Sequence, residues 1–283
     1  MIVDCHTHVN LDAGDKGCAE HLTATEALDA CVVLPSLGPD RQAINTFVSQ
    51  HVRAHKDRMI GFALIDPTAD DVSAAGLKDR MQEWGMQGVV VYCAASGFHP
   101  SHSHALCLYE VAQEQGWPVF FHNGDLERKT EGNLSFAQPM LLDEIAQMYP
   151  DLKMVIGSMG RPFVEQTLLI IGRHKNVYAD LAIRPACVWQ TYNMIVAAHE
   201  RQVMDKLLFG SAYPPGRVES CIETLLGFNM MFADTNLPTV PRGLLRNVVE
   251  RPTLEVLGLD AKAIKTKEHK DTTPPNSKTK SKT

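Results

Sequence analysis

The sequence predicts a single (β/α)₈ barrel over residues 1–260. Three observations support this fold: eight short apolar runs, helical patterns in the gaps between them, and a length of 283 residues. An α/β barrel of about 250 residues forms as one domain and buries a large core without cross-links. A doubly wound open sheet has the same alternation of strands and helices, but eight repeats favour a closed barrel.

The eight apolar runs are continuous in hydrophobic residues rather than alternating with polar ones. This pattern is typical of parallel strands that are buried on both faces, as in a TIM barrel. The expected strands are 2–5, 30–34, 59–65, 88–92, 118–121, 153–156, 177–179 and 206–209.

Helical signals occupy the gaps between these strands. Asp40 can cap a helix after the second strand, and Asp70 and Asp71 can cap the next one. Pro162 suits the first turn of a helix after the sixth strand. Further helices are expected over 104–115, 139–149, 188–203 and 217–231.

The composition excludes several classes of protein. A net charge of −6 and a pI near 6.0 leave no basic footprint for nucleic acid. No apolar run approaches the roughly 20 residues of a membrane helix, and no signal peptide precedes the first strand. The seven cysteines are scattered without a Cys-x-x-Cys pair, which is typical of a reducing compartment. We therefore expect a cytoplasmic protein with a small-molecule substrate. Barrels of this kind often pair, so a homodimer is one possible assembly.

The composition changes at residue 261. Residues 261–283 are rich in Lys, Thr and Pro and carry almost no apolar side chains. Such a segment buries too little surface to offset the entropy lost on ordering, so we expect a disordered, solvated tail. A basic docking segment is the alternative.

Three histidines lie where expected strands end. His6 and His8 follow the first strand, and alternation along an extended chain points both side chains the same way. His122 ends the fifth strand, and the carboxyl ends of barrel strands meet at one mouth. Three neutral imidazoles with an open position form one type of catalytic zinc site. The alternative is a structural role, since a lone His-x-His pair, such as His102 and His104, is usually solvated.

Other polar side chains follow the expected strands at the same rim. Asp180 ends the seventh strand and is either a catalytic base or a hydrogen-bond anchor. Arg184 is the better candidate for holding a substrate carboxylate through its guanidinium fork, whereas we expect Arg161 to be solvated or salt-bridged. Three further rim residues are expected to have ordinary roles: Asp125 as a loop cap, Cys93 as a small buried hydrophobe and His99 as a solvated loop residue.

Six stretches carry a family resemblance: VDCHTH, GVVVYCAASGFHP, LYEVAQEQGWPVFFHNG, PDLKMVIGSMGRP, NVYADLA and KLLFGSAYP. In order and spacing, over roughly residues 1–260, they resemble the amidohydrolase-related family. This branch of the amidohydrolase superfamily includes decarboxylases and lactonases of small carboxylated substrates. The resemblance implies that His6, His8 and His122 are metal ligands.

The same resemblance implies a catalytic His after the sixth strand and a catalytic, metal-binding Asp after the eighth. This chain departs from the family at both places, with Ser158 in Gly-Ser-Met-Gly and Ala212 in Gly-Ser-Ala-Tyr-Pro. Ala212 lacks the carboxylate that would orient and deprotonate an attacking water. Ser158 can hydrogen-bond but is a poor metal ligand and a poor base.

Three functions follow from these residues. The first is a hydrolase or decarboxylase that acts on a small carboxylated or cyclic substrate with one divalent metal, zinc by preference, on the three histidines. The second is a metal-independent, lactonase-like hydrolase in the same barrel. The third is a catalytically inactive barrel that binds a ligand, which the residues at 158 and 212 favour.

Overall fold

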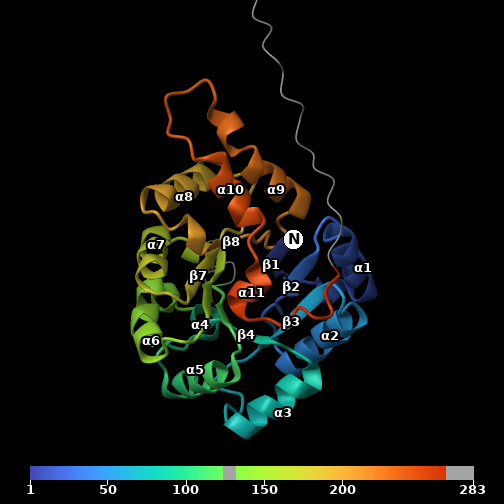
Figure 1. Ribbon diagram of the computed structural model, residues 1–283. Helices are drawn as coiled ribbons and strands as arrows, with labels where there is room; N and C mark the ends of the chain where they lie inside the picture. The colour runs from blue at the N-terminus through green and yellow to red at the C-terminus, as the bar shows by residue number, and fades with distance from the viewer. Residues whose placement is uncertain (124–131, 266–283) are drawn as a thin grey trace, which may run out of the picture.

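A computed structural model describes residues 1–123 and 132–265. Eight strands pair in parallel and in chain order, and helices surround them (Figure 1). The sheet closes on itself, because Cys5 N donates to Phe209 O at 2.9 Å and Thr7 bridges to Tyr213. The predicted (β/α)₈ barrel is therefore confirmed. The strands are β1 (Val3–Thr7), β2 (Ala30–Val33), β3 (Met59–Leu64), β4 (Gly88–Val91), β5 (Val119–Phe121), β6 (Met154–Ile156), β7 (Val177–Asp180) and β8 (Leu207–Leu208).

Helices follow the strands as the alternating pattern predicted. The α-helices are α1 (Asp15–Ala24), α2 (Arg41–Ala54), α3 (Ala74–Trp84), α4 (Cys93–Ser96), α5 (Ser103–Gln115), α6 (Leu142–Met148), α7 (Val164–Arg173), α8 (Val188–Glu200), α9 (Val218–Leu226), α10 (Arg242–Val249) and α11 (Thr253–Leu257). Short 3₁₀ helices are η1 (Leu11–Ala13), η2 (Leu134–Ala137), η3 (Pro139–Leu141), η4 (Gly157–Gly160), η5 (Met204–Lys206) and η6 (Phe228–Phe232).

One of the predicted helix starts is confirmed and two are wrong. Asp40 caps α2, accepting a hydrogen bond from a backbone N–H of the first turn. The cap of α3 is Ser73, not Asp70 or Asp71, because the Asp71 carboxylate is turned to the N–H and hydroxyl of Ser73. Pro162 precedes α7 by two residues instead of occupying its first turn. The helices α1, α4, α10 and α11 were not predicted.

Helix α11 closes the amino end of the barrel. Leu254 and Leu257 of α11 pack with the side chains that fill the barrel interior, and Figure 1 shows α11 lying across the strands. Arg251 Nε donates to Leu207 O at 2.8 Å, which ties this region to the start of β8. The interior side chains include Val3, Cys5, Ala30, Val32, Leu34, Ile60, Phe62, Leu64, Val90, Tyr92, Phe120, Val155 and Leu208.

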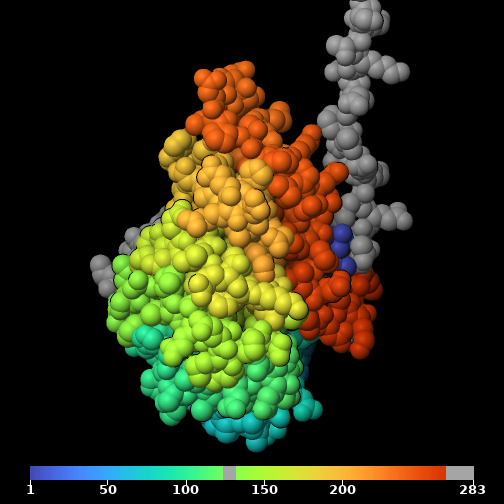
Figure 2. Space-filling view, turned by 60° about the vertical axis from the view of Figure 1, so that its left-hand side comes forward, coloured from blue at the N-terminus to red at the C-terminus, as the bar shows by residue number. Residues whose placement is uncertain are grey.

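The segment that follows α9 projects from the barrel and is seen in orange in Figures 1 and 2. Stacked aromatic rings attach it to α8. Tyr192 lies 5.6 Å from the Phe228 ring and 4.4 Å from the Phe232 ring, centroid to centroid. The Tyr192 hydroxyl also donates to Pro238 O at 3.0 Å.

Only the first residues of the predicted tail, 261–265, are among the described residues. Lys265 N donates to Asp57 O at 3.0 Å, so the chain still contacts the barrel at this point. Residues 266–283, and with them most of the expected tail, lie outside the described residues, as does Asp125. Over 1–123 and 132–265, none of the helices has the length and apolar character needed to span a bilayer.

A pair of buried histidines lies behind β1, between α1 and α2. His21 Nδ1 is 3.1 Å from His51 Nε2, and His21 Nε2 is 3.0 Å from the Thr7 hydroxyl. Because Thr7 donates its only proton to Val32 O, His21 must donate at Nε2 and accept at Nδ1. Burial lowers the pKa of His21 to about 3 and that of His51 to about 4. Both imidazoles are therefore neutral at pH 7.

This pair predicts an acid-sensitive barrel. As the pH is lowered from 6.5 toward 4, the unfolded chain binds protons at both histidines before the folded chain does. The free energy of unfolding therefore decreases as the pH is lowered. Replacing His51→Gln keeps a donor for His21 and removes one titrating group. We expect the slope of stability against pH to decrease by at most about 1.4 kcal/mol per pH unit.

The measurement is urea denaturation of wild-type and variant protein from pH 7 to pH 4.5, with a chelator present throughout. Equal slopes for the two proteins would show that His51 does not titrate on unfolding.

Candidate metal centre

An extra residue in β1 aims the first two histidines. Asp4 pairs with Cys31 and Thr7 with Val33, so β1 advances by three residues where β2 advances by two. Val3 and Cys5 face the barrel interior before this irregularity. After it Thr7 faces the outer helices, where it contacts His21, and His6 and His8 face inward. Such bulges re-aim side chains next to functional sites.

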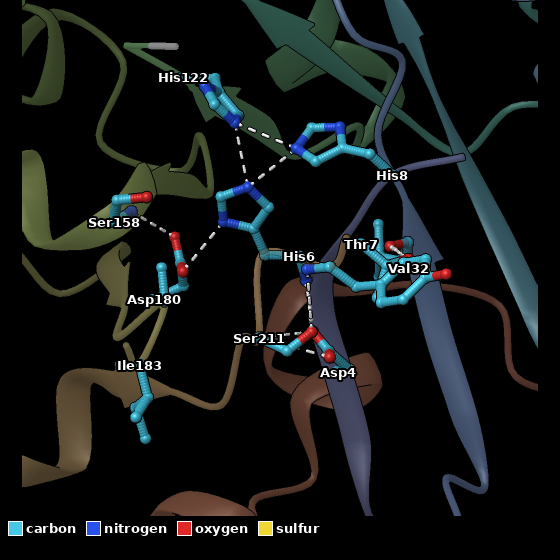
Figure 3. Close-up of polar contacts among 12 residues, drawn as sticks. Asp4, His6, Thr7, His8, Val32, His122, Ser158, Asp180, Ile183 and Ser211 are labelled. Atoms are coloured by element: carbon cyan, nitrogen blue, oxygen red, sulfur yellow. Dashed lines mark hydrogen bonds and ion pairs between the residues drawn. The ribbon is translucent and has the colours of Figure 1, made fainter. Parts of the chain in front are cut away.

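Asp4 holds this bulge. Its carboxylate accepts hydrogen bonds from His6 N at 2.9 Å and from Ser211 N at 3.1 Å (Figure 3). The side chain is fully buried, and burial raises its pKa to about 6. Asp4 thus satisfies the amide that the bulge removes from the ladder and joins β1 to the chain after β8. Asp4 was not among the predicted site residues; its position two residues before His6 was the available signal.

Three imidazoles converge at the carboxyl ends of β1 and β5. The Nε2 atoms of His6, His8 and His122 form a triangle with sides of 3.1, 3.0 and 3.2 Å. Figure 3 shows all three rings pointing toward one centre. The structure therefore brings together the three residues that the strand ends predicted. Among the described residues they are the one group of this kind with metal-ligand geometry.

The hydrogen bonds behind two of these rings fix their tautomers. His8 Nδ1 is 2.7 Å from Leu34 O, a carbonyl that can only accept, so His8 carries its proton there. His6 Nδ1 is 3.0 Å from Asp180 Oδ1 and donates to that carboxylate. When both rings are neutral, each presents a lone pair at Nε2, and the two Nε2 atoms are 3.1 Å apart.

That arrangement fits a bound cation. Two lone pairs without a proton between them repel each other, and a positive ion between them removes the repulsion. A metal-bound histidine typically donates its other N–H to a carboxylate or a backbone carbonyl, as His6 and His8 do. Burial and the neighbouring imidazoles lower the pKa of His8 to about 3 and that of His122 well below its usual value. His8 and His122 are therefore neutral at pH 7, as the nitrogen ligands of a divalent metal must be.

Asp180 lies behind His6 rather than free at the mouth. Its Oδ1 accepts from His6 Nδ1, and its Oδ2 accepts from Ser158 N at 2.6 Å. The side chain has no exposed surface. Both carboxylate oxygens are thus engaged, an arrangement that suits an anchor for His6. The catalytic role of Asp180 stays a prediction.

Ser158 and Ala212 serve the site through their backbones. Ser158 N donates to Asp180, and Ala212 N donates to His6 O at 2.8 Å. Both residues have positive φ, 54° and 53°, a conformation that costs an L-residue about 1 kcal/mol or more. Within the described part of the chain, no carboxylate joins the three histidines as a ligand.

The other rim candidates are placed as follows. Arg161 is buried rather than solvated, with guanidinium bonds to Ala182 O at 3.2 Å and to the Gln190 side chain at 3.3 Å. Arg184 is partly buried on the loop after β7, and its substrate role stays a prediction. Cys93 is buried in the outer core as expected, and His99 is partly exposed and accepts from Ser101 N.

A small cavity lies beside His122. It is lined by Cys93, Asn123, Phe136 and Leu142, among others, and has a volume of about 10 Å³. This is the size of one water molecule. The cavity is therefore too small for an organic substrate.

Comparisons with known proteins agree with the family resemblance of the sequence and with the barrel fold. A family model described as Amidohydrolase matches residues 3–234. None of the curated proteins matches the chain. The barrel resembles a probable 2-pyrone-4,6-dicarboxylic acid hydrolase from Acinetobacter baumannii, with 14% identity and a TM-score of 0.64 over 91% of this chain and 99% of that one.

Two decarboxylases have similar structures. The 5-carboxyvanillate decarboxylase of Sphingomonas paucimobilis shares 11% identity, with a TM-score of 0.65 over 92% of this chain and 99% of that one. A dihydroxybenzoic acid decarboxylase from Polaromonas, with bound manganese and an inhibitor, shares 12% identity, with a TM-score of 0.60 over 91% of this chain and 96% of that one. At these identities the likeness shows the fold.

Close packing at Gly210 generates a test of this geometry. A Cβ at Gly210 would lie 2.7 Å from Asp180 Oδ1 and 3.0 Å from His6 Cβ. Gly210→Ala must therefore displace the His6–Asp180 pair, and we expect a loss of about 1–3 kcal/mol in the free energy of unfolding. Gly243→Ala is the control, since a Cβ at Gly243 meets nothing within 4 Å and replaces a glycine inside α10.

Urea denaturation of both variants measures the effect. The control should be neutral or more stable by up to about 1 kcal/mol. A Gly210→Ala protein as stable as the control would show that the pair has room to move.

Proposed function

The chain belongs to the amidohydrolase family, and from this premise we propose that it is a hydrolase or decarboxylase of a small carboxylated or cyclic substrate. We propose that one divalent metal is held by His6, His8 and His122. The observation that carries the proposal is the approach of His6 Nε2 to His8 Nε2 at 3.1 Å, with each ring held by a hydrogen bond at Nδ1. A site that bound a substrate carboxylate or carbonyl directly, without a metal, would not need two imidazole nitrogens in this arrangement.

Zinc is the metal that we propose for this donor set. Zinc binds three imidazole nitrogens readily and keeps a further position open for water or substrate. Manganese prefers carboxylate and water oxygens, and manganese is bound in the Polaromonas decarboxylase. Since no carboxylate accompanies the three imidazoles in the described chain, the balance moves from manganese toward zinc.

The roles of the chain's own residues follow from their contacts. When bound, the metal would polarise a substrate carbonyl or lower the pKa of a water. Asp180 holds the proton of His6 at Nδ1 and so keeps Nε2 available. We propose Arg184 as the group that holds a substrate carboxylate, because it lies on the loop after β7 at the same rim. The seven cysteines are all free, which supports a reducing, cytoplasmic location.

Ser158 and Ala212 favour a second candidate function. A barrel with neither a bound metal nor a side-chain base at these positions can hydrolyse only an activated substrate, as a metal-independent lactonase-like enzyme would, or bind a ligand without turnover. Turnover that survives exhaustive chelation would favour the metal-independent enzyme. Ligand binding without turnover, with or without metal, would favour the inactive barrel.

Metal content tests the first proposal directly. Protein purified without chelator should contain about one equivalent of zinc, measured by elemental analysis. Changing any one of His6, His8 or His122 to Ala should lower the metal content below one tenth of that value, because two imidazoles hold zinc far more weakly. His99→Ala serves as the control, since His99 lies outside the triangle. Wild-type protein that neither carries a metal nor binds added zinc, cobalt or manganese would overturn the metal proposal.

Asp180→Asn tests the anchor role. An asparagine presents an amide N–H₂ and one oxygen, so it cannot accept from both His6 and Ser158 N. Donation from the amide to His6 Nδ1 would move the His6 proton to Nε2 and block the metal position. We expect zinc affinity to fall by about 10- to 100-fold, measured by competition with a chromophoric chelator.

Asp143→Asn is the matched control for this measurement. Asp143 also pairs with a histidine, His174, at 2.7 Å, but on the outside of the barrel. Its replacement should leave zinc affinity unchanged. Wild-type affinity in Asp180→Asn, combined with lost turnover, would instead assign Asp180 the role of a base.

A further inference from the structure

We propose that Tyr92 is a positioning residue for His122 and that two successive carbonyls, Leu34 O and Pro35 O, anchor two of the three imidazoles. The inference rests on the proposed metal function for its consequence, but its geometry stands on contacts within the chain. Tyr92 lies at the end of β4, directly after its last residue.

The contact between Tyr92 and His122 is a parallel stack. The two ring centroids are 4.6 Å apart and the ring planes differ by 26°. The other imidazoles meet His122 edge-on, at 77° for His6 and 65° for His8. A face-to-face contact restricts rotation of the imidazole about its χ2 axis, because tilting the ring drives it into its neighbour. Tyr92 therefore sets the plane in which His122 Nε2 points.

The Tyr92 ring is itself held in place. Its hydroxyl donates to Pro35 O at 2.9 Å, and the side chain is only 3% exposed. Burial raises the pKa of Tyr92 above its usual value, so the hydroxyl keeps its proton and remains a donor. Phe120 adds a second aromatic neighbour, 6.0 Å from the His122 ring.

The anchor at the end of β2 serves two ligands at once. Leu34 O accepts from His8 Nδ1 at 2.7 Å, and the next carbonyl, Pro35 O, accepts from Tyr92. Leu34 N in turn donates to Thr7 O at 2.8 Å, which joins this dipeptide to β1. Proline fixes its own φ and holds the preceding residue in an extended conformation. The 34–35 dipeptide is thus a stiff link between His8 and, through Tyr92, His122.

Two substitutions separate the stack from the hydroxyl. Tyr92→Phe keeps the ring and removes the bond to Pro35 O, and we expect a loss of zinc affinity of up to about tenfold. Tyr92→Leu removes the ring, and we expect a loss of about 10- to 100-fold, the range found for groups that orient metal ligands. Tyr109→Phe and Tyr109→Leu are matched controls, because Tyr109 is a fully buried tyrosine in the outer core.

A double-mutant cycle shows whether Tyr92 acts through His122. In a His122→Ala background Tyr92→Leu should no longer change the zinc affinity that remains. Wild-type affinity in Tyr92→Leu, or an equal loss in both backgrounds, would overturn the proposal. A loss of the same size in Tyr109→Leu would mean that any cavity weakens the site and would overturn it as well.

A metal-free measurement separates this inference from the metal proposal. In the apo protein the NMR signals of the His122 ring should shift and broaden in Tyr92→Leu and remain sharp in Tyr92→Phe. If wild-type protein binds no metal, the proposed function fails, and this measurement still decides the inference. Unchanged His122 signals in Tyr92→Leu would overturn it.

Discussion

The extra residue in β1 is the constraint on which the rest of the site depends. A regular strand would keep Asp4, His6 and His8 on one face, opposite Val3 and Cys5, and would point the histidines at the outer helices. The bulge exchanges the two faces within the strand, so that apolar residues fill the lower barrel and imidazoles line its mouth. The amide of His6, left without a ladder partner, is satisfied by Asp4. A one-residue irregularity therefore converts a core strand into a ligand-bearing one.

Backbone N–H and C=O groups orient several side chains of this site. Leu34 O fixes the tautomer of His8, Ser158 N holds Asp180, and Ala212 N binds His6 O. The side chains at 158 and 212 differ from those expected of the family, yet the amides at both positions still contribute to the same network. This explains how the three imidazoles keep their geometry although two side chains of the expected machinery are absent. The frame and the chemistry of the site are separable.

The sequence predicts those features that depend on local pattern. Eight continuous apolar runs predicted eight buried parallel strands, and the ends of two runs predicted the convergence of His6, His8 and His122. Features that depend on distant partners were missed or misplaced. Ser73, and not Asp70 or Asp71, caps α3. The Asp71 carboxylate instead accepts a hydrogen bond from Ser73 N. The contacts of Asp4, Tyr92 and the 34–35 carbonyls join strands far apart in the chain, and single-sequence periodicity carries no record of such pairs.

The position of α11 has a consequence for the order in which the barrel can form. Its leucines complete an interior that begins with Val3, the third residue of the chain. During synthesis, β1 to β8 emerge before the helix that covers their amino ends, so the inner core stays open to water until Leu257 has been translated. Chaperone binding or premature association would act on this nascent state, in which every strand is present but α11 does not yet cover their amino ends.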